Sequence, residues 1–326
     1  MDINRIIEKK VFMAPMAGVN SPAFCEILRD YGCPVIYTAL LTSHGLRYQN
    51  KKTLEYVNAL PDGPIYIGQL FGGVPEIMAE AAVLLEKTGR FEAIDINMGC
   101  PAPKVIKGNS GVGLMRDPAL AESIVKETVN SVKIPVTVKI RSGWSADEIN
   151  CVELAARFES AGAAALTLHP RTRTQGFKGA ADWSLVGDVK KAVAIPVIGS
   201  GDITSPEAAA RRMRDTGCDA VMIGRAARGD PEIISRAIKL IGNLDPGPPP
   251  GDIERIDIAL KHLRLNIEIE GPERGVRTIR GHIAWYLKGL PGASAVRAEI
   301  NQTENPEDVA LILKNYMSQL DNRNCS

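Results

Sequence analysis

The chain has 326 residues, which is enough for one large α/β domain and a small additional domain. Its hydrophobic content of 45%, charged content of 24% and formal net charge of +1 are ordinary for a globular protein and exclude a strongly basic, nonspecific polyanion binder. Residues 1–10 lack the apolar core of a signal peptide, no apolar stretch is long enough to cross a bilayer, and the six cysteines form no metal-ligand cluster with the four histidines. We therefore expect a cytoplasmic protein without a membrane segment or a metal site.

Short apolar runs alternate with helical patterns up to about residue 242. Eight runs are predicted as strands: Val11–Met16, Pro34–Ala39, Pro64–Leu70, Ala93–Asn97, Pro135–Arg141, Ala164–His169, Pro196–Ser200 and Ala220–Ile223. Helical patterns between them include Pro75–Lys87, Pro118–Val132, Ala146–Ala161, Pro206–Asp215 and Pro231–Ile241. This α/β alternation predicts a TIM (β/α)8 barrel over residues 1–242. An open doubly wound sheet, the alternative, would need a GxGxxG turn after the first strand, where the chain has Met16-Ala17-Gly18-Val19-Asn20.

A Pro- and Gly-rich segment over residues 243–251 predicts a linker. Beyond it, helical periodicity covers Asp252–Gly271, Arg274–Leu290 and Pro306–Gln319. We therefore expect a small C-terminal helical domain over residues 252–326.

The run from Asp95 to Pro101 is the most informative segment of the chain. It predicts a buried strand that ends in a Gly-Cys-Pro turn and presents the thiol of Cys100 at the carboxyl end of that strand. Ligands bind at this end of the strands in parallel α/β folds. Taken alone, a buried and inert cysteine is the more frequent finding, so the interpretation depends on the other strand ends.

Polar side chains and flexible turns follow the other predicted strands. They are Pro15, Met16, Ala17, Gln69, Asn97, Lys139, Arg141, His169, Ser200, Gly201, Asp202, Gly224 and Arg225. Each one alone is compatible with ordinary polar capping, but together they indicate a cofactor site. Glycine loops after the last two strands form the recurrent phosphate site of TIM barrels. A lysine pointing into a barrel, such as Lys139, would stabilise a reduced flavin, although a salt-bridged lysine is equally compatible with the local sequence.

Two groups of basic residues suit an RNA backbone. Arg171, Arg173 and Lys178 surround Phe177 in the loop after the sixth strand, and Arg277, Arg280 and Lys288 lie in the helical domain. A solvated charged surface is the alternative for both groups.

Several motifs together resemble those of the bacterial-type tRNA-dihydrouridine synthase family. They are Ala14-Pro15-Met16-Ala17-Gly18, Asp95-Ile96-Asn97-Met98-Gly99-Cys100-Pro101, Lys139-Ile140-Arg141-Ser142-Gly143-Trp144, His169-Pro170-Arg171-Thr172-Arg173, Gly201-Asp202-Ile203, Met222-Ile223-Gly224-Arg225-Ala226-Ala227 and Trp285-Tyr286-Leu287. The chain departs from the family at Ser200, where Asn is common, and this weakens the inference of a cofactor contact there.

The resemblance implies an FMN-dependent barrel that reduces the C5=C6 bond of uridine in tRNA, with NADPH or NADH reducing the flavin. In that reaction the reduced flavin would supply a hydride to C6 and Cys100 a proton to C5. An ordinary thiol has a pKa of about 8.5 and can act as a general acid at neutral pH. Asn97, Arg141, Arg171, Arg173, Lys178, Arg277, Arg280 and Lys288 would contact the RNA, and the remaining strand-end residues would contact the cofactor.

Two alternatives stay open. A small-molecule flavin reductase on the same barrel would have no use for the helical domain. A noncatalytic RNA-binding protein on a decayed barrel would have lost the acid or the flavin-binding groups, yet Cys100, Lys139 and His169 are present. We expect a monomer that binds tRNA.

Overall fold

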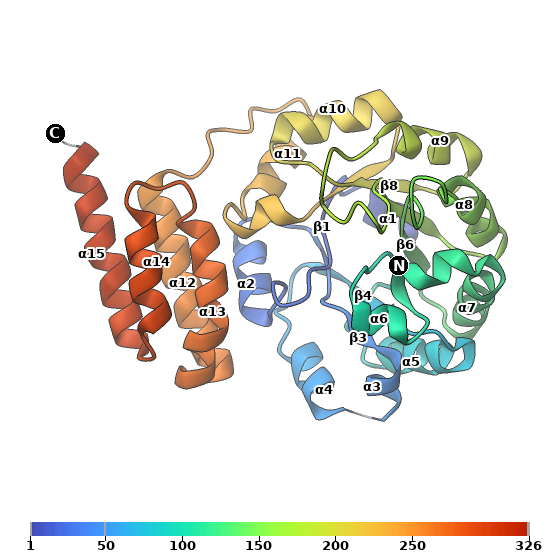
Figure 1. The fold of residues 1–326 in the computed structure, drawn as a ribbon, viewed down its shortest axis with the longest axis horizontal. Coiled ribbons are helices and arrows are strands. Elements are labelled where there is room, and N and C mark those ends of the chain that lie inside the picture. Colours follow the sequence, from blue (N-terminus) through green and yellow to red (C-terminus); the bar gives the residue numbers. More distant parts are fainter. Residues whose placement is uncertain (1, 49, 325–326) are drawn as a thin grey trace.

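The computed structural model describes residues 2–48 and 50–324, and Cys325 lies outside them. Within the described residues, eight parallel strands close into a barrel (Figure 1). They are β1 (Val11–Met13), β2 (Val35–Tyr37), β4 (Ile65–Phe71), β5 (Ala93–Met98), β6 (Val136–Arg141), β7 (Ala165–His169), β8 (Val197–Ser200) and β9 (Ala220–Ile223). Pairing of β1 with both β2 and β9, and of β2 with β4, completes the ring. The predicted TIM barrel is therefore confirmed.

A short additional strand, β3 (Leu41–Thr42), pairs with the end of β4 and was not predicted. The helices around the barrel and its loops are α2 (Pro22–Asp30), α3 (Ser43–Arg47), α4 (Lys51–Asn58), α5 (Pro75–Lys87), α6 (Pro103–Lys107), α7 (Pro118–Ser131), α8 (Cys151–Ser160), α9 (Ser184–Ala192), α10 (Pro206–Thr216) and α11 (Ile233–Ile241). Two 3-10 helices, η1 (Gly111–Arg116) and η2 (Arg225–Arg228), lie in loops after β5 and β9.

The predicted start of α8 at Ala146 is wrong, since the helix begins at Cys151. The preceding residues instead fold back on themselves, with an antiparallel bridge between Gly143 and Ile149. A side chain at Gly143 would come within 2.0 Å of the Glu148 carbonyl oxygen, so this close approach requires glycine.

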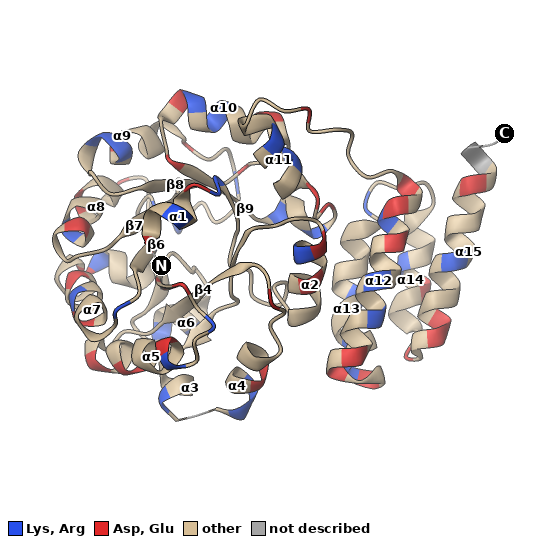
Figure 2. Cartoon of the chain, turned by 180° about the vertical axis from the view of Figure 1, so that it is seen from behind, with Lys and Arg blue, Asp and Glu red and all other residues tan. Residues whose placement is uncertain are grey.

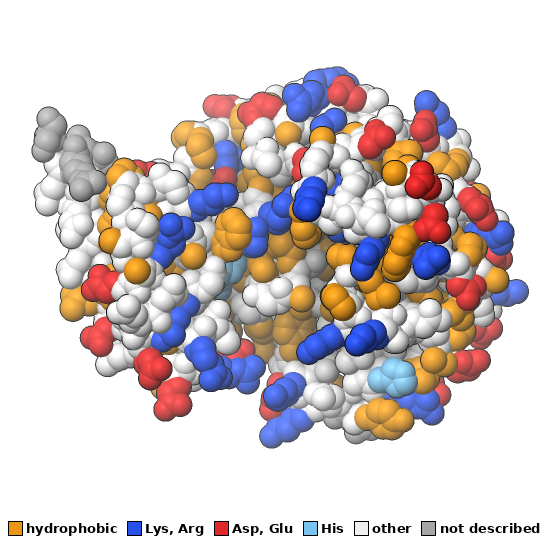
Figure 3. Space-filling model, viewed as in Figure 1, with side chains coloured by type: hydrophobic (Ala, Val, Ile, Leu, Met, Phe, Trp, Pro, Cys, Tyr) orange, Lys and Arg blue, Asp and Glu red, His pale blue; other side chains and the backbone are white. Residues whose placement is uncertain are grey.

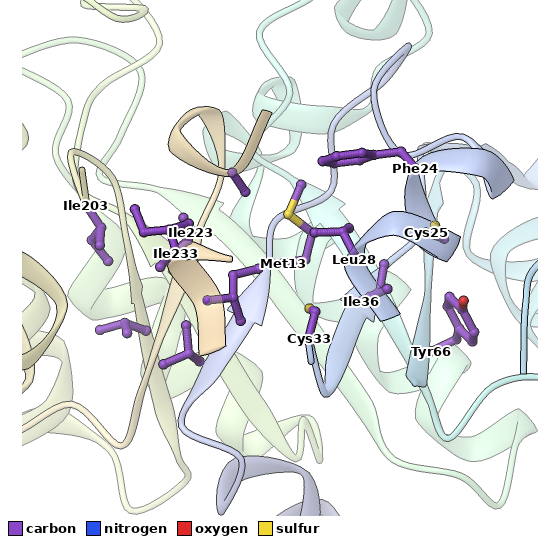
Figure 4. Packing of buried hydrophobic residues seen from close by; sticks show 14 of the residues in the cluster. Met13, Phe24, Cys25, Leu28, Cys33, Ile36, Tyr66, Ile203, Ile223 and Ile233 are labelled. Carbon is purple, nitrogen blue, oxygen red and sulfur yellow. The ribbon is translucent and has the colours of Figure 1, made fainter. Parts of the chain in front are cut away.

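Alternate residues of each strand point to opposite sides, and this divides the core in two. Outward-facing side chains such as Met13 and Ile36 pack with Leu28 of α2 in the strand–helix layer (Figure 4). Inward-facing side chains at the amino ends of the strands are apolar and form a second cluster, which includes Phe12, Ile67 and Ile198. Helix α1 (Ile3–Ile7) lies across this end and adds Ile6 and Ile7 to the cluster (Figure 2).

The inward-facing positions nearer the carboxyl ends are polar on β4, β5 and β6. Gln69, Asp95 and Thr137 are fully buried there and lie side by side in register. An apolar plug at one end and polar side chains at the other direct any chemistry to the carboxyl ends of the strands.

After α11, residues 245–250 contain neither helix nor strand. In the described part of the C-terminal region, four helices follow: α12 (Asp252–Glu270), α13 (Pro272–Tyr286), α14 (Ala293–Gln302) and α15 (Pro306–Asn324). Three of them were predicted with shifted ends, and α14 was not. The division of function between a barrel domain and an RNA-binding domain stays a prediction.

The C-terminal helices sit beside α2 of the barrel (Figure 1). Phe24 of α2 contacts the rings of His262 on α12 and His282 on α13, with ring centroids 5.5 and 4.4 Å away. Lys261 Nζ pairs with Asp30 Oδ2 at 2.5 Å across the same interface. The helices are thus held against the barrel by aromatic packing and an ion pair.

Candidate active site at the mouth of the barrel

A cavity of about 540 Å³ opens at the carboxyl ends of the strands. Its wall includes most of the predicted site residues: Pro15, Met16, Ala17, Gln69, Asn97, Cys100, Lys139, Arg141, His169, Ser200, Gly201, Asp202, Gly224, Arg225 and Lys288. The fold therefore brings together residues from seven strands and the turns that follow them, and from the segment after α13. Arg171, Arg173, Lys178, Arg277 and Arg280 do not line this cavity.

The thiol of Cys100 is presented by a turn that its neighbours hold closed. Asn97 Oδ1 accepts hydrogen bonds from the backbone N–H of Cys100 at 2.9 Å and of Gly99 at 3.2 Å. The Cys100 carbonyl accepts from Val112 N at 3.2 Å. Gly111 has a positive φ, and a side chain there would come within 2.8 Å of the Cys100 carbonyl oxygen. Of the described cysteines, Cys100 alone is not fully buried.

Arg141 ties this turn to the loop after β7. Its Nε donates to the Gly99 carbonyl at 3.0 Å, and its Nη1 donates to the carbonyls of Thr172 and Gly176 at 2.9 and 3.0 Å. Burial, followed by the charge of Arg171, lowers the pKa of Arg141 to about 10. Arg141 therefore lines the cavity and also connects the Cys100 turn to the loop after β7.

Lys139 and His169 are both basic residues of the cavity wall, but burial affects their protonation to different extents. Burial lowers the pKa of Lys139 to about 8, although the charge of Asp95 opposes this change. Burial, reinforced by the surrounding Lys and Arg charges, lowers the pKa of His169 to about 2, so this imidazole is neutral at physiological pH. Its Nε2 is buried and has no hydrogen-bond partner among the described residues, which is unusual for a buried polar atom.

The loops after β8 and β9 bring glycine backbone to the cavity wall. Gly201 has φ +113°, and a side chain there would come within 2.7 Å of the His169 ring. Gly224 precedes η2. The Asp202 carboxylate pairs with Arg171 at 2.7 Å and accepts from Ala181 N at 2.8 Å, so its negative charge is balanced within the protein. Arg171 is 2% exposed, so its role here is to hold the loop.

The remaining basic residues divide by accessibility. Lys178 and Arg277 are exposed, and Arg173 lies over the Trp144 ring at 4.8 Å. Arg280 is half-buried and donates to the Thr303 carbonyl. Arg277 and Lys288 are thus the freer of the three predicted cations on and after α13.

The cavity-wall residues that the predictions from sequence did not assign to the site include Arg228 and Trp285. The Arg228 guanidinium carbon lies 3.4 Å from the Trp285 ring centroid, and Lys288 Nζ lies 5.3 Å from it. The short spacing between Trp285 and Lys288 was a signal that the two share one surface. Figure 3 shows Lys and Arg side chains around the hollow of the barrel, so the mouth is positive although the chain is nearly neutral.

The cavity fits an anionic, planar cofactor. A buried neutral imidazole nitrogen lacks a partner, a lysine and an arginine supply positive charge, and Gly201 lets the His169 ring lie close to the backbone at the cavity wall. A phosphate-bearing flavin offers a partner for the imidazole nitrogen and negative charge for the two cations. Among the described residues, no group of three or more His, Cys, Asp or Glu side chains could hold a metal ion, and no described helix is long and apolar enough to span a membrane.

Comparison with known proteins places the chain among tRNA-modifying relatives. A family model described as dihydrouridine synthase matches residues 12–322. A probable tRNA-dihydrouridine synthase 1 of Synechocystis sp. is 39% identical, with 93% of this chain and 84% of the relative covered. The tRNA-dihydrouridine synthase B of Pseudomonas aeruginosa is 37% identical, with 97% of this chain and 95% of the relative covered.

Solved structures share the barrel at low identity. Histamine dehydrogenase from Rhizobium sp. 4-9 superposes with a TM-score of 0.54 at 13% identity, covering 78% of this chain and 49% of that chain. The 6-hydroxypseudooxynicotine amine oxidase from Pseudomonas geniculata gives 0.56 at 14% identity, covering 78% and 50%. The chain spans about half the length of these structures, and the likeness concerns the fold.

Proposed function

Since the chain belongs to the dihydrouridine synthase family, we propose that it reduces the C5=C6 bond of uridine in tRNA to 5,6-dihydrouridine. FMN is the proposed cofactor and NADPH, or NADH, the reductant of the flavin. The observation that supports this most strongly is Cys100, held on a rigid turn at the edge of a positive cavity that contains an unpartnered His169 Nε2.

The proposed cofactor contacts follow from the cavity wall. His169, Lys139 and Gln69 would contact the ring system, and the segments Pro15–Ala17, Ser200–Asp202 and Gly224–Arg225 would hold the ribityl phosphate. When bound and reduced, the flavin supplies the hydride that adds to C6 of uracil.

The protein's own part in the reaction is to supply a proton and to stabilise charge. Asn97 would bind the uracil edge, and the Cys100 thiol would donate its proton to C5. A negative charge on Cys100 acts on both Lys139 and Arg141, which would stabilise the thiolate that remains. The target base must leave its stack to reach this depth, a step that the exposed cations Lys178, Arg277 and Lys288 would assist by binding the backbone.

Mass spectrometry of tRNA nucleosides tests the function directly. A strain that lacks the protein should lose dihydrouridine at specific positions and regain it on complementation with the wild-type chain. Purified protein should be yellow and release FMN. Unchanged nucleosides in the deletion strain, with reduction of free uridine or another small enone by the purified protein, would favour a small-molecule reductase instead.

A further inference from the structure

A buried carboxylate lies beneath the candidate active site. Asp95 is fully buried on β5, and it lies in register with Gln69 on β4 and Thr137 on β6. Thr137 Oγ1 donates to Asp95 Oδ1 at 2.6 Å, and Gln69 Nε2 donates to Asp95 Oδ2 at 2.6 Å. Burying a carboxylate is costly, so its position inside the barrel calls for an explanation.

From Asp95 a chain of hydrogen bonds runs to the turn of Cys100. Gln69 Oε1 accepts from Asn97 Nδ2 at 2.8 Å, and Asn97 Oδ1 accepts from Cys100 N at 2.9 Å and Gly99 N at 3.2 Å. Gln69 is fully buried and Asn97 is 6% exposed, so these hydrogen bonds are largely shielded from bulk water.

The direction of donation along this chain is fixed at both ends. Backbone N–H groups can only donate, so Asn97 must present its oxygen to Cys100. Gln69 must then present its oxygen to Asn97 and its amide nitrogen to Asp95, where only an acceptor satisfies it. A residue without an acceptor oxygen at position 95 would remove the partner that holds the Gln69 carboxamide in this orientation.

We propose that Asp95 is a positioning residue, which orients the carboxamides of Gln69 and Asn97 and thereby holds the Cys100 turn in its reactive geometry. The proposal deepens the proposed function, because the thiol held in this way is the proposed proton donor. It also explains why Asp95 is buried directly behind the cavity wall, to which Gln69, Asn97 and Cys100 belong.

The positioning role requires a hydrogen-bond acceptor at position 95, but it does not require a negative charge there. Burial raises the pKa of Asp95 to about 7, against the hydrogen bonds of Thr137 and Gln69 and the charge of Lys139. When protonated, Asp95 can donate to the Thr137 hydroxyl and still accept from Gln69, so the direction of the chain survives. Asp95→Asn can do the same through its amide, whereas Asp95→Leu cannot.

The test compares these two variants in the FMN-loaded protein. The rate at which iodoacetamide alkylates Cys100 is measured by peptide mass mapping. The kcat and KM are measured with tRNA as substrate. Asp95→Asn should keep the alkylation rate within about twofold of wild type, while Asp95→Leu should alkylate about fivefold faster as the turn opens. Its kcat should fall about ten- to hundredfold with KM nearly unchanged, since misplacement of a reacting group by about 1 Å has this effect.

Two results would overturn the proposal: equal behaviour of Asp95→Asn and Asp95→Leu, or a wild-type alkylation rate in Asp95→Leu. Should Asp95→Leu not fold, Gln69→Met interrupts the same chain and leaves the Asp95–Thr137 bond intact. It should also speed alkylation, and a wild-type rate would overturn the proposal. If alkylation follows the expected pattern but no protein, wild type included, forms dihydrouridine, the proposed function fails and the positioning role stands.

Discussion

At the scale of single residues, Cys100 is set apart from the other described cysteines by its place at the cavity, and the buried thiols are packing residues. Cys100→Ala should retain FMN and NADPH oxidation and lose about two to four powers of ten in the rate of dihydrouridine formation, because only the proton transfer loses its donor. Rates are measured by nucleoside analysis of tRNA, with buried Cys218→Ala as the control. Full activity in Cys100→Ala would remove the thiol from the mechanism.

Arg171 shows what sequence reasoning cannot see at this scale. In the sequence it belongs to an exposed basic loop and resembles an RNA contact. In the structure it is buried against Asp202, its partner 31 residues away, and donates to the Gly179 carbonyl. An ion pair between two loops that are far apart in the sequence produces no local sequence pattern from which it could be predicted. Cys100, by contrast, was predictable because a strand, a turn and a thiol follow one another directly.

At the scale of elements, the loop after β8 depends on one glycine. Gly201→Ala should weaken FMN binding about tenfold or more, because the added methyl group would meet the His169 ring and the backbone would be strained. Gly89→Ala is the matched control, since Gly89 also has a positive φ but faces open space. Fluorescence titration of each apoprotein with FMN measures the FMN affinity of the two variants. Equal affinities would contradict the prediction.

The contact between α12 and α13 carries a pH dependence of stability. Burial lowers the pKa of His282 to about 4 and that of His262 well below its usual value, so both are neutral in the folded state. The unfolded chain takes up protons below about pH 6.5, and the free energy of unfolding should therefore fall as the pH drops from there toward 4. For His282 alone the loss is about 3 kcal/mol.

Urea unfolding between about pH 4.5 and 7.5 measures this slope. His282→Gln should flatten it, because glutamine can donate to the Arg228 carbonyl as His282 Nε2 does and does not titrate. His44→Gln, at an exposed site, should leave the slope unchanged. An equal slope in wild type and His282→Gln would show that His282 does not titrate on unfolding.

The strands were the most predictable elements, because each is a short apolar run between turn residues. The start of α8 was not, since residues 146–150 have helical composition but are drawn into a bridge between Gly143 and Ile149. Helix α14 was missed because Val296 and Ile300 are the only large apolar residues in its short sequence, and the helix packs against α13 and α15. The alignment of Gln69, Asp95 and Thr137 could not be predicted, because the predicted barrel makes their strands neighbours but does not fix the register in which the strands pair.

At the scale of the whole molecule, positive charge is concentrated where two parts of the chain meet. The double variant Arg277→Ala/Lys288→Ala should weaken tRNA binding and lower its salt slope by about one unit for each lost phosphate contact, with FMN content unchanged. Both side chains are exposed, whereas Arg280 is engaged by Thr303. Lys126→Ala, which removes an exposed lysine on α7 of the barrel, is the control. Wild-type affinity and slope would move the RNA surface to Arg173 and Lys178.

The contact between α13 and the barrel affects the order in which the barrel and the cavity form during translation. His282 Nε2 donates to the Arg228 carbonyl at 2.9 Å, and Trp285 and Lys288 complete the cavity wall. All strands of the barrel emerge from the ribosome before these residues, since chains are made from the amino end. A nascent chain can thus close its barrel while one side of the cavity wall is still missing, and the cavity is complete only when the C-terminal helices dock.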